Sequence, residues 1–321
     1  MSILLWGLIR DQPMSAVLTH LRRLDAPVHF LDQRQVLETT VEVDGGRTSR
    51  TVVTVAGETF DLGRVHAAYL RPHDSTQLPG LRARAHSSPE WRHAAEVDQV
   101  LNAWSDRTAA YVLNRPEAAA GNASKPFQLR AIAGAGFFVP PTLVTNDPDQ
   151  VAEFIRMHGD VIVKSVSGVR SRVRRVRSTD KLADVAACPT QFQRRVPGTD
   201  VRVHVVGVEV FAAEVDSDAD DYRYARALGH RDPVLTAIDL PPEVSVRCLD
   251  LARRLGLPVA GIDLRRTPDG EWYCFEVNPS PGFTYYESKT GQPIAAAVGG
   301  RGGESGPPPP GSPAHRMEAG F

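Results

Sequence analysis

Two carboxylates near the C-terminal end of the chain are expected to face each other. Residues 261–282 read GIDLRRTPDGEWYCFEVNPSPG, and Asp269-Gly270 lies between two apolar-rich runs, which predicts a β-hairpin with a two-residue turn. With that turn Asp263 pairs with Glu276, and the Cβ atoms of such a pair lie about 4.5–5.5 Å apart. Like charges at this spacing destabilise a sheet, so the pair needs a functional explanation. A three-residue loop with a bulge is the alternative, and it would shift the pairing and separate the two carboxylates by part of a residue step.

The same strand face also offers an amide oxygen. Period-two alternation places Glu276 and Asn278 on one face, together with Cys274. Two carboxylates and an amide oxygen are hard ligands suited to Mg²⁺, which would also bind nucleotide phosphates and water. A solvated acidic face would explain any single carboxylate. Three oxygen ligands on one face, followed by Pro-Ser-Pro-Gly, favour a metal site instead.

A lysine at a strand end is a candidate phosphate ligand. Only four of the 37 basic residues are lysine, and Lys164 ends the apolar run DVIVK before a loop that contains serines and Gly168. Backbone N–H groups of such a loop can cradle phosphate, although the P-loop pattern is absent and strand-end lysines are usually solvated. The arginines of residues 170–177 could instead bind nucleic acid, but no aromatic residues are interleaved with them.

Two further segments carry charged residues in suggestive positions. In GTDVRVHVV, the side chains of Asp200, Arg202 and His204 share one strand face while valines occupy the other. An acid and an arginine on one face could hold a ribose hydroxyl and a phosphate, but a half-buried strand gives the same pattern. Arg223 in ADDYRYAR could clamp an anionic group, and a surface salt-bridge loop explains it equally well.

Composition restricts the class of protein. The chain has 321 residues, a net charge of −1 and a pI of about 6.8, so its overall charge favours neither nucleic acid nor a membrane surface as a partner. No apolar run approaches the ~20 residues of a membrane span. Three scattered cysteines fit a reducing cytoplasm, and the sequence motifs of zinc proteases, serine hydrolases and dinucleotide-binding folds are absent.

The elements that must position these residues form two units and a tail. In residues 1–113, apolar runs alternate with helical patterns, which predicts a small open α/β domain. The expected strands are 3–9, 28–32, 65–72 and 110–114, with helices at 14–24 and 89–106 and a hairpin insertion at 39–62. The second unit, residues 114–297, has expected helices at 124–136, 149–158 and 241–258 between short strands. Residues 298–321 are rich in glycine and proline and are expected to be disordered.

Together these segments resemble the ATP-grasp superfamily, most of all the RimK-like carboxylate–amine ligases and the related peptide-maturing ligases. The similarity covers about residues 114 to 296, and residues 1–113 look like the smaller domain that precedes the grasp. The resemblance implies an α/β ATP-grasp fold with its nucleotide cleft between subdomains 114–190 and 191–297.

The resemblance also implies roles for individual residues. Asp263, Glu276 and Asn278 match the metal-binding set, which holds two Mg²⁺ ions against the ATP phosphates, with Mn²⁺ as an alternative ion. Lys125 in SKPFQLR and Lys164 match the two phosphate-contacting lysines.

The remaining matches concern the nucleoside and the reacting groups. Main-chain groups near Gln193 and Val196 would hold adenine, and Asp200 would bind ribose. Arg202 and Arg223 resemble arginines near the transferred phosphate and the acyl phosphate. Related ligases often carry Glu-aromatic where this chain has Arg194-Arg195, a departure from the family pattern at the adenine-binding segment.

The implied activity is formation of an amide between a carboxylate, activated by ATP as an acyl phosphate, and an amine. Substrates would be amino acids, peptides or proteins, with neither nucleic acid nor membrane as partner and a homo-oligomer left open. The alternatives are a ribosomal-peptide maturase that forms intramolecular ester or amide cross-links, a phosphotransferase and a non-catalytic nucleotide-binding module.

Overall fold

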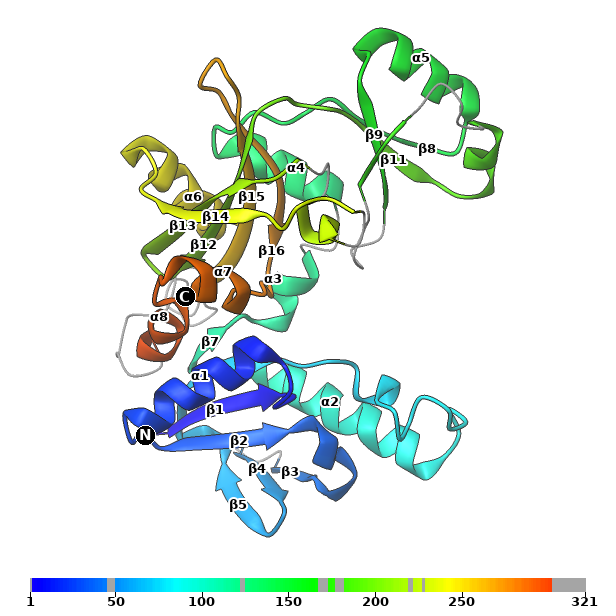
Figure 1. Ribbon diagram of the computed structural model, residues 1–321. Helices are drawn as coiled ribbons and strands as arrows, with labels where there is room; N and C mark the ends of the chain where they lie inside the picture. Colours follow the sequence, from blue (N-terminus) through cyan, green and yellow to red (C-terminus); the bar gives the residue numbers. More distant parts are fainter. Residues whose placement is uncertain are drawn as a thin grey trace, which may run out of the picture.

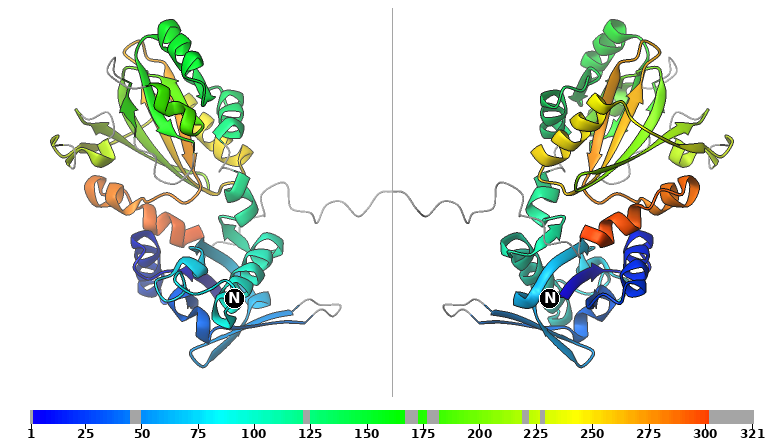
Figure 2. Two further views of the ribbon diagram at one scale, coloured as in Figure 1. Left: turned by 90° about the vertical axis from the view of Figure 1, so that its right-hand side faces the viewer. Right: turned by 90° about the vertical axis from the view of Figure 1, so that its left-hand side faces the viewer.

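The computed structural model describes residues 2–44, 50–121, 125–166, 173–176, 182–218, 222–226 and 229–301. An N-terminal α/β unit lies at one end of the molecule and a small sheet carrying helix α5 at the other, with a larger sheet between them (Figures 1 and 2). Within these described residues, every helix is too short or too polar to cross a membrane.

The N-terminal unit contains a parallel four-stranded sheet of order β2-β1-β6-β7. Its strands are β1 (Ser2–Gly7), β2 (Val28–Asp32), β6 (Val65–Arg71) and β7 (Tyr111–Leu113). Its helices are α1 (Gln12–Arg23) and α2 (Pro89–Arg107), with short 3₁₀ turns η1 (Gln33–Glu38), η2 (Leu62–Arg64) and η3 (Ser75–Gln77). The predicted strand and helix alternation is therefore present.

Helices α1 and α2 cover opposite faces of this sheet because the side chains of β1 alternate. Leu5 packs with residues of α1, whereas Trp6 packs with residues of α2. Each helix has a capping side chain and a proline in its first turn: the carboxylate of Asp11 accepts from Met14 N (3.0 Å), and the hydroxyl of Ser88 accepts from Trp91 N (3.2 Å).

The expected hairpin insertion is a three-stranded antiparallel sheet, β3 (Thr40–Asp44), β4 (Arg50–Val55) and β5 (Glu58–Asp61). Residues 45–49, which include the predicted Gly-Gly turn, lie outside the described residues. The second turn, at Ala56-Gly57, has positive φ at both residues, as tight hairpin turns require.

The small sheet of the second unit is antiparallel, with order β10-β9-β11-β8. Its strands are β8 (Thr142–Thr145), β9 (Val161–Ser165), β10 (Arg174–Arg175) and β11 (Thr190–Arg194). Helix α5 (Pro148–His158) and η4 (Leu182–Ala187) pack against it through a core that includes Val151, Val161 and Phe192. Helices α3 (Pro116–Gly121) and α4 (Lys125–Gly134) connect this sheet to the N-terminal unit.

The larger sheet is also antiparallel, with order β14-β13-β12-β15-β16. Its strands are β12 (Thr199–Val206), β13 (Glu209–Asp216), β14 (Val234–Ile238), β15 (Val259–Arg266) and β16 (Trp272–Asn278), with η5 (Tyr222–Tyr224) after β13. Helix α6 (Pro242–Arg254) and α4 pack on one face, where valines of β12 meet Ile262 and Leu264. Asp200, Arg202, Asp263 and Arg265, which alternate with these core residues, therefore lie on the other face.

The last two helices, α7 (Thr284–Thr290) and α8 (Ile294–Arg301), return to the N-terminal unit. Ile294 and Val298 are buried in one cluster with Val17 and Leu21 of α1, so the end of the second unit packs on the first (Figure 1). The expected start of the tail at residue 298 is wrong, because the buried face of α8 continues the helix to Arg301. Residues 302–321 lie outside the described residues.

Candidate active site

The hairpin of β15 and β16 has a different turn from the one predicted. Thr267 N donates to Glu271 O (2.9 Å) and Gly270 N to Thr267 O (3.0 Å), so three residues, Pro268 to Gly270, form the loop. Gly270 has a φ of +84°, as a type I turn followed by a left-handed glycine requires. The predicted two-residue turn is therefore wrong, and near the loop the strands are offset by one residue.

A bulge restores the expected pairing farther along the hairpin. Leu264 pairs with Cys274 but Asp263 pairs with Glu276, so Phe275 is the extra residue. The predicted Asp263–Glu276 pair is confirmed because the bulge cancels the offset of the turn. The predicted face of Cys274 is wrong: the bulge turns that side chain into the same core as Val277, where it is fully buried.

The oxygen atoms near this pair fit a magnesium site by type and by lack of other partners. Among the described residues, the Glu276 carboxylate has no hydrogen-bond or ion-pair partner, and Asp263 has one, Arg202. Asn278 lies two residues beyond Glu276, and its Oδ1 accepts from Ser280 N (2.9 Å), which fixes the amide in a local turn. Two facing carboxylates with few protein partners suit a hard divalent cation.

Arg202 is held in a buried position beside this pair. Its Nη1 lies 2.7 Å from Asp263 Oδ1, and only 8% of the arginine side chain is exposed, against 31% of the aspartate. Burial alone would lower the pKa of Arg202, but the attraction of Asp263 and of two nearby tyrosines outweighs it, and the pKa is raised. The guanidinium is therefore charged at every physiological pH.

His204 and two tyrosines complete the environment of Arg202. Arg202 Nε donates to His204 Nε2 (3.4 Å), and the His204 ring packs edge-on against Tyr286 at 4.9 Å between centroids. The hydroxyls of Tyr222 and Tyr286 are 2.7 Å apart. Burial, followed by the charge of Arg202, lowers the pKa of His204 well below its usual value. A neutral His204 that accepts from Arg202 is structural, as its strand pattern suggested.

A second ion pair lies next to the first on the same two strands. Asp200 is opposite Arg265, and Arg202 is opposite Asp263. Arg265 binds the Asp200 carboxylate through Nε and Nη2, both at 2.8 Å, and donates through Nη1 to Val196 O (2.7 Å). Its guanidinium also lies over the ring of Phe275, 5.3 Å from the centroid. Asp200, predicted to bind ribose, is thus already held by an arginine that the sequence reasoning missed.

Lys164 and Gln193 meet on the small sheet. Lys164 Nζ donates to Gln193 Oε1 (3.3 Å), and Gln193 Nε2 donates to Thr142 Oγ1 (2.9 Å). The Lys164 side chain is buried to 8% residual exposure, so it is not the solvated strand-end lysine of the simpler interpretation. Its buried position suits a fixed positive charge directed at a bound anion.

The segment after β11 leaves one main-chain donor free at the position predicted for adenine. Arg194 N and Arg195 N donate to Pro141 O (3.0 Å) and Asp160 O (2.8 Å). The N–H group of Val196 has no partner among the residues that the structure describes, although that residue is 2% exposed. Because buried N–H groups are normally paired, Val196 N is available for a ligand.

A family model for the RimK-like ATP-grasp domain matches residues 122–299, more than half of the chain. This protein belongs to the RimK-like ATP-grasp family. A protein described as a probable alpha-L-glutamate ligase from Marinobacter nauticus is 28% identical over 200 residues, which cover 59% of this chain and 65% of the relative. The match therefore spans less than two thirds of the length of that relative.

Two solved structures resemble nearly the whole chain, including the N-terminal unit. The macrocyclase MdnC from Microcystis aeruginosa, bound to the precursor peptide MdnA, gives a TM-score of 0.81 at 22% identity and covers 95% of this chain and 100% of its own. The ATP-grasp ligase PsnB, in complex with a phosphomimetic variant of its minimal precursor, Mg and ADP, gives a TM-score of 0.77 at 27% identity. The match covers 94% of this chain and 97% of PsnB. These likenesses confirm the predicted ATP-grasp fold.

Within the ATP-grasp unit, the side chain of Gln128 in α4 is hydrogen-bonded to β16, the edge strand that carries Glu276. Gln128 Nε2 donates to Val277 O (2.7 Å), and Val277 N donates to Gln128 Oε1 (3.3 Å). The side chain is 4% exposed, and it pairs main-chain groups that β16, as an edge strand, would otherwise leave open. The sequence reasoning missed it, because a glutamine within a helical pattern gives no signal of its distant partner.

Several predicted residues of the ATP-grasp site lie where little can be described. Lys125 is the first residue of α4 and Arg223 lies in η5, but their side chains are outside the described residues. The same holds for residues 167–172 and 177–181, most of the arginine-rich loop. Their roles remain predictions.

Proposed function

We propose that this protein is an ATP- and Mg²⁺-dependent ligase that activates a substrate carboxylate as an acyl phosphate and joins it to an amine. The observation that carries the proposal is the direct pairing of Asp263 with Glu276 on a sheet face that also holds Asn278 and Arg202. Membership of the RimK-like ATP-grasp family and the resemblance to PsnB support this function.

The reaction proceeds by two displacements. A carboxylate oxygen attacks the γ-phosphorus of ATP, the bond to the β-phosphate oxygen breaks, and ADP leaves. The amine nitrogen then attacks the acyl carbon, the carbon–oxygen bond to phosphate breaks, and the nitrogen loses a proton to solvent or to a base. The chain supplies position and charge rather than a covalent nucleophile.

The described residues divide this work between the two sheets. Asp263, Glu276 and Asn278 would hold Mg²⁺, two ions by analogy with the family or Mn²⁺ in its place, which neutralises phosphate charge. Arg202, permanently charged and fixed by Asp263, stabilises negative charge on the transferred group. Lys164 presents a buried ammonium to the phosphates from the small sheet.

The nucleoside is bound by the segment after β11 and by the neighbouring ion pair. Val196 N donates to the adenine ring, and Phe275 provides an apolar surface. Asp200 remains the ribose acceptor, with Arg265 holding its carboxylate in place. Arg194 Nη2 donates to the Tyr273 hydroxyl (3.2 Å) and Arg195 Nη1 lies 3.6 Å from Asp160 Oδ2, so both side chains have partners of their own and Val196 N is left for adenine.

A second candidate function is intramolecular cross-linking of a ribosomally made peptide by the same chemistry. The observation that favours this function is the resemblance to PsnB, which was solved with its precursor and which matches 94% of this chain, including the N-terminal unit. Mass spectrometry distinguishes the two: one peptide loses one water per cross-link, whereas a ligase joins two molecules. A stable phosphorylated product would instead indicate a phosphotransferase.

The test is ADP release by purified Glu276→Gln with Mg-ATP and a mixed amino-acid and peptide pool. We expect the exchange to abolish turnover, because it removes one metal-binding charge while it keeps the side-chain shape, and to leave the melting temperature unchanged. Glu271→Gln, an exposed carboxylate on the same hairpin, is the matched control and should turn over normally. Near-normal ADP release by Glu276→Gln would refute the metal assignment.

A further inference from the structure

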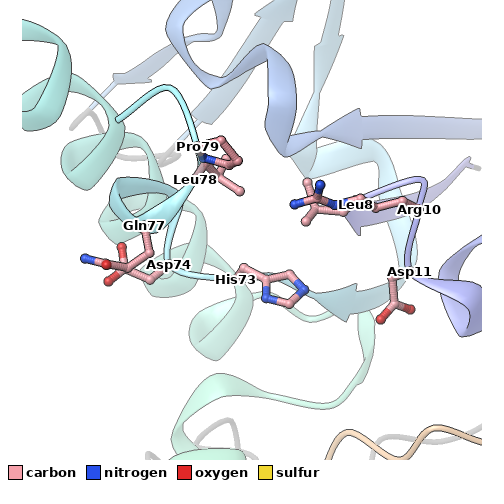
Figure 3. A pocket seen from close by; sticks show the side chains of 8 residues that line it. All are labelled: Leu8, Arg10, Asp11, His73, Asp74, Gln77, Leu78 and Pro79. Carbon is pink, nitrogen blue, oxygen red and sulfur yellow. The ribbon is translucent and has the colours of Figure 1, made fainter. Parts of the chain in front are cut away.

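A cavity of about 550 Å³ lies in the N-terminal unit, at the carboxyl ends of β1 and β6 (Figure 3). The chain passes from β1 through α1 to β2 on one side, whereas β6 and β7 lie on the other side of β1. The loops that follow β1 and β6 therefore diverge, and in open parallel sheets ligands bind at such a switch in strand order. The volume lies within the range of small-ligand pockets, roughly 300–1,000 Å³.

The polar groups that extend into the cavity are those of Arg10 and His73. Figure 3 shows the Arg10 guanidinium and the His73 ring projecting into the space between the two loops, while the side chains of Asp74 and Gln77 turn aside. In the described part of the chain, neither the Arg10 guanidinium nor the His73 ring has a hydrogen-bond or ion-pair partner. Leu78, which also lines the cavity, offers an apolar surface beside them.

The two carboxylates of the cavity wall are already bound. Asp11 pairs with Arg71, with Oδ1 2.8 Å from Nε and Oδ2 3.2 Å from Nη2, and also caps α1. Asp74 accepts from Thr76 N (2.9 Å) and Thr76 Oγ1 (2.5 Å) as the cap of η3. Because these charges have local partners, the unbalanced charge directed into the cavity is that of Arg10.

The cavity wall is joined to the segment that follows the candidate metal ligands. Arg71, while paired with Asp11, donates through Nη1 to Pro281 O (3.0 Å), and Pro281 is three residues beyond Asn278. Thr284 Oγ1 also donates to Gln12 Oε1 (3.3 Å) at the start of α1. The cavity wall therefore contacts the segment that directly follows the candidate metal ligands.

We propose that this cavity binds an acidic side chain of the peptide substrate, with the carboxylate on Arg10 and His73 and the methylene groups against Leu78. The inference rests on the proposed ligase function and adds to it a substrate-positioning site in the N-terminal unit, at the carboxyl ends of β1 and β6. Arg10 is a substrate-positioning residue in this role.

The experiment compares a short fluorescein-labelled Glu-Gly repeat peptide with its Gln-Gly counterpart, by fluorescence anisotropy at low salt with the full-length protein. We expect the wild type to bind the Glu-Gly peptide about fivefold more tightly and Arg10→Gln to lose this preference, as for an exposed ion pair. Arg92→Gln is the matched control and should keep the preference, because Arg92 is an exposed arginine of α2 whose guanidinium has no partner among the described residues.

Mg-ADP binding, measured separately by calorimetry, keeps the two proposals distinguishable. Failure of every variant and of the wild type to bind Mg-ADP overturns the ligase function, on which this inference rests. Two outcomes overturn the cavity proposal alone. One is normal Mg-ADP binding by a wild type that shows no preference for the Glu-Gly peptide, and the other is an equal loss of that preference in Arg10→Gln and Arg92→Gln. Weaker Mg-ADP binding by Arg10→Gln with an unchanged peptide preference also overturns it, because the cavity would then serve the nucleotide.

Discussion

Gly261 is the residue on which the position of the Arg202 guanidinium depends. It lies in β15, opposite both His204 and Asn278. A Cβ atom added there would be 2.0 Å from Arg202 Nη2 and 2.7 Å from both Arg202 Cζ and Pro281 Cβ. A glycine inside a strand often marks such a close approach by another group. We therefore predict that Gly261→Ala displaces Arg202 from Asp263.

The magnitude follows from these distances. Ordinary contact begins at 3.4 Å, so Nη2 must retreat by about 1.4 Å, and a shift of that size in a rigid, planar guanidinium disturbs the 2.7 Å ion pair of Nη1 with Asp263. Overpacking costs about 1–3 kcal/mol, and loss of a charge-assisted hydrogen bond costs about 1.5–3 kcal/mol. We expect Gly261→Ala to lower the free energy of unfolding by about 2.5–6 kcal/mol, the sum of the two costs.

The assay is urea unfolding followed by tryptophan fluorescence, combined with Mg-ATP turnover. Gly80→Ala is the matched control, because its added Cβ would meet no atom within 4 Å and it should change neither quantity. A double-mutant cycle with Arg202→Ala tests the cause, since removing the guanidinium should relieve much of the cost. If Gly261→Ala lowers the free energy of unfolding by less than about 0.5 kcal/mol and turns over Mg-ATP normally, the position of Arg202 does not depend on this contact.

Two further predictions concern the supports of the site. Gln128→Leu should lower the free energy of unfolding in urea by about 2–4 kcal/mol, because it leaves the main-chain N–H and C=O of Val277 without the amide of Gln128. A stability within about 0.5 kcal/mol of the wild type would show that these two hydrogen bonds do not support β16. Because the pKa of His204 is lowered in the folded state, the unfolded chain alone takes up that proton as the pH falls below about 6.5, so stability is lost on acidification. His204→Gln should reduce the slope of unfolding free energy between pH 5 and 6.5 by up to about 1.4 kcal/mol per pH unit, and parallel slopes for variant and wild type would show that His204 does not titrate differently in the two states.

The sequence alone determined the features that depend on local order. Alternation in VRVHVV assigned Arg202 and His204 to one face because side chains of a strand alternate wherever it is paired. The Asp-Gly signal placed Glu276 opposite Asp263, since a short turn fixes the register of the strands beside it. The prediction survived two compensating departures, the longer loop and the bulge at Phe275, because each shifts the pairing by one residue and the two shifts cancel.

Tertiary structure decided the features that join distant segments. Strands β12 and β15 are separated by residues 207–258 and share no turn, so only packing of their common core sets the register that pairs Asp200 with Arg265 and Arg202 with Asp263. Likewise, the cavity beside Arg10 exists because the loops after β1 and β6 diverge at the switch in strand order. Local sequence fixes which way a side chain points along its own strand, whereas its partner across the sheet depends on how the whole chain is packed.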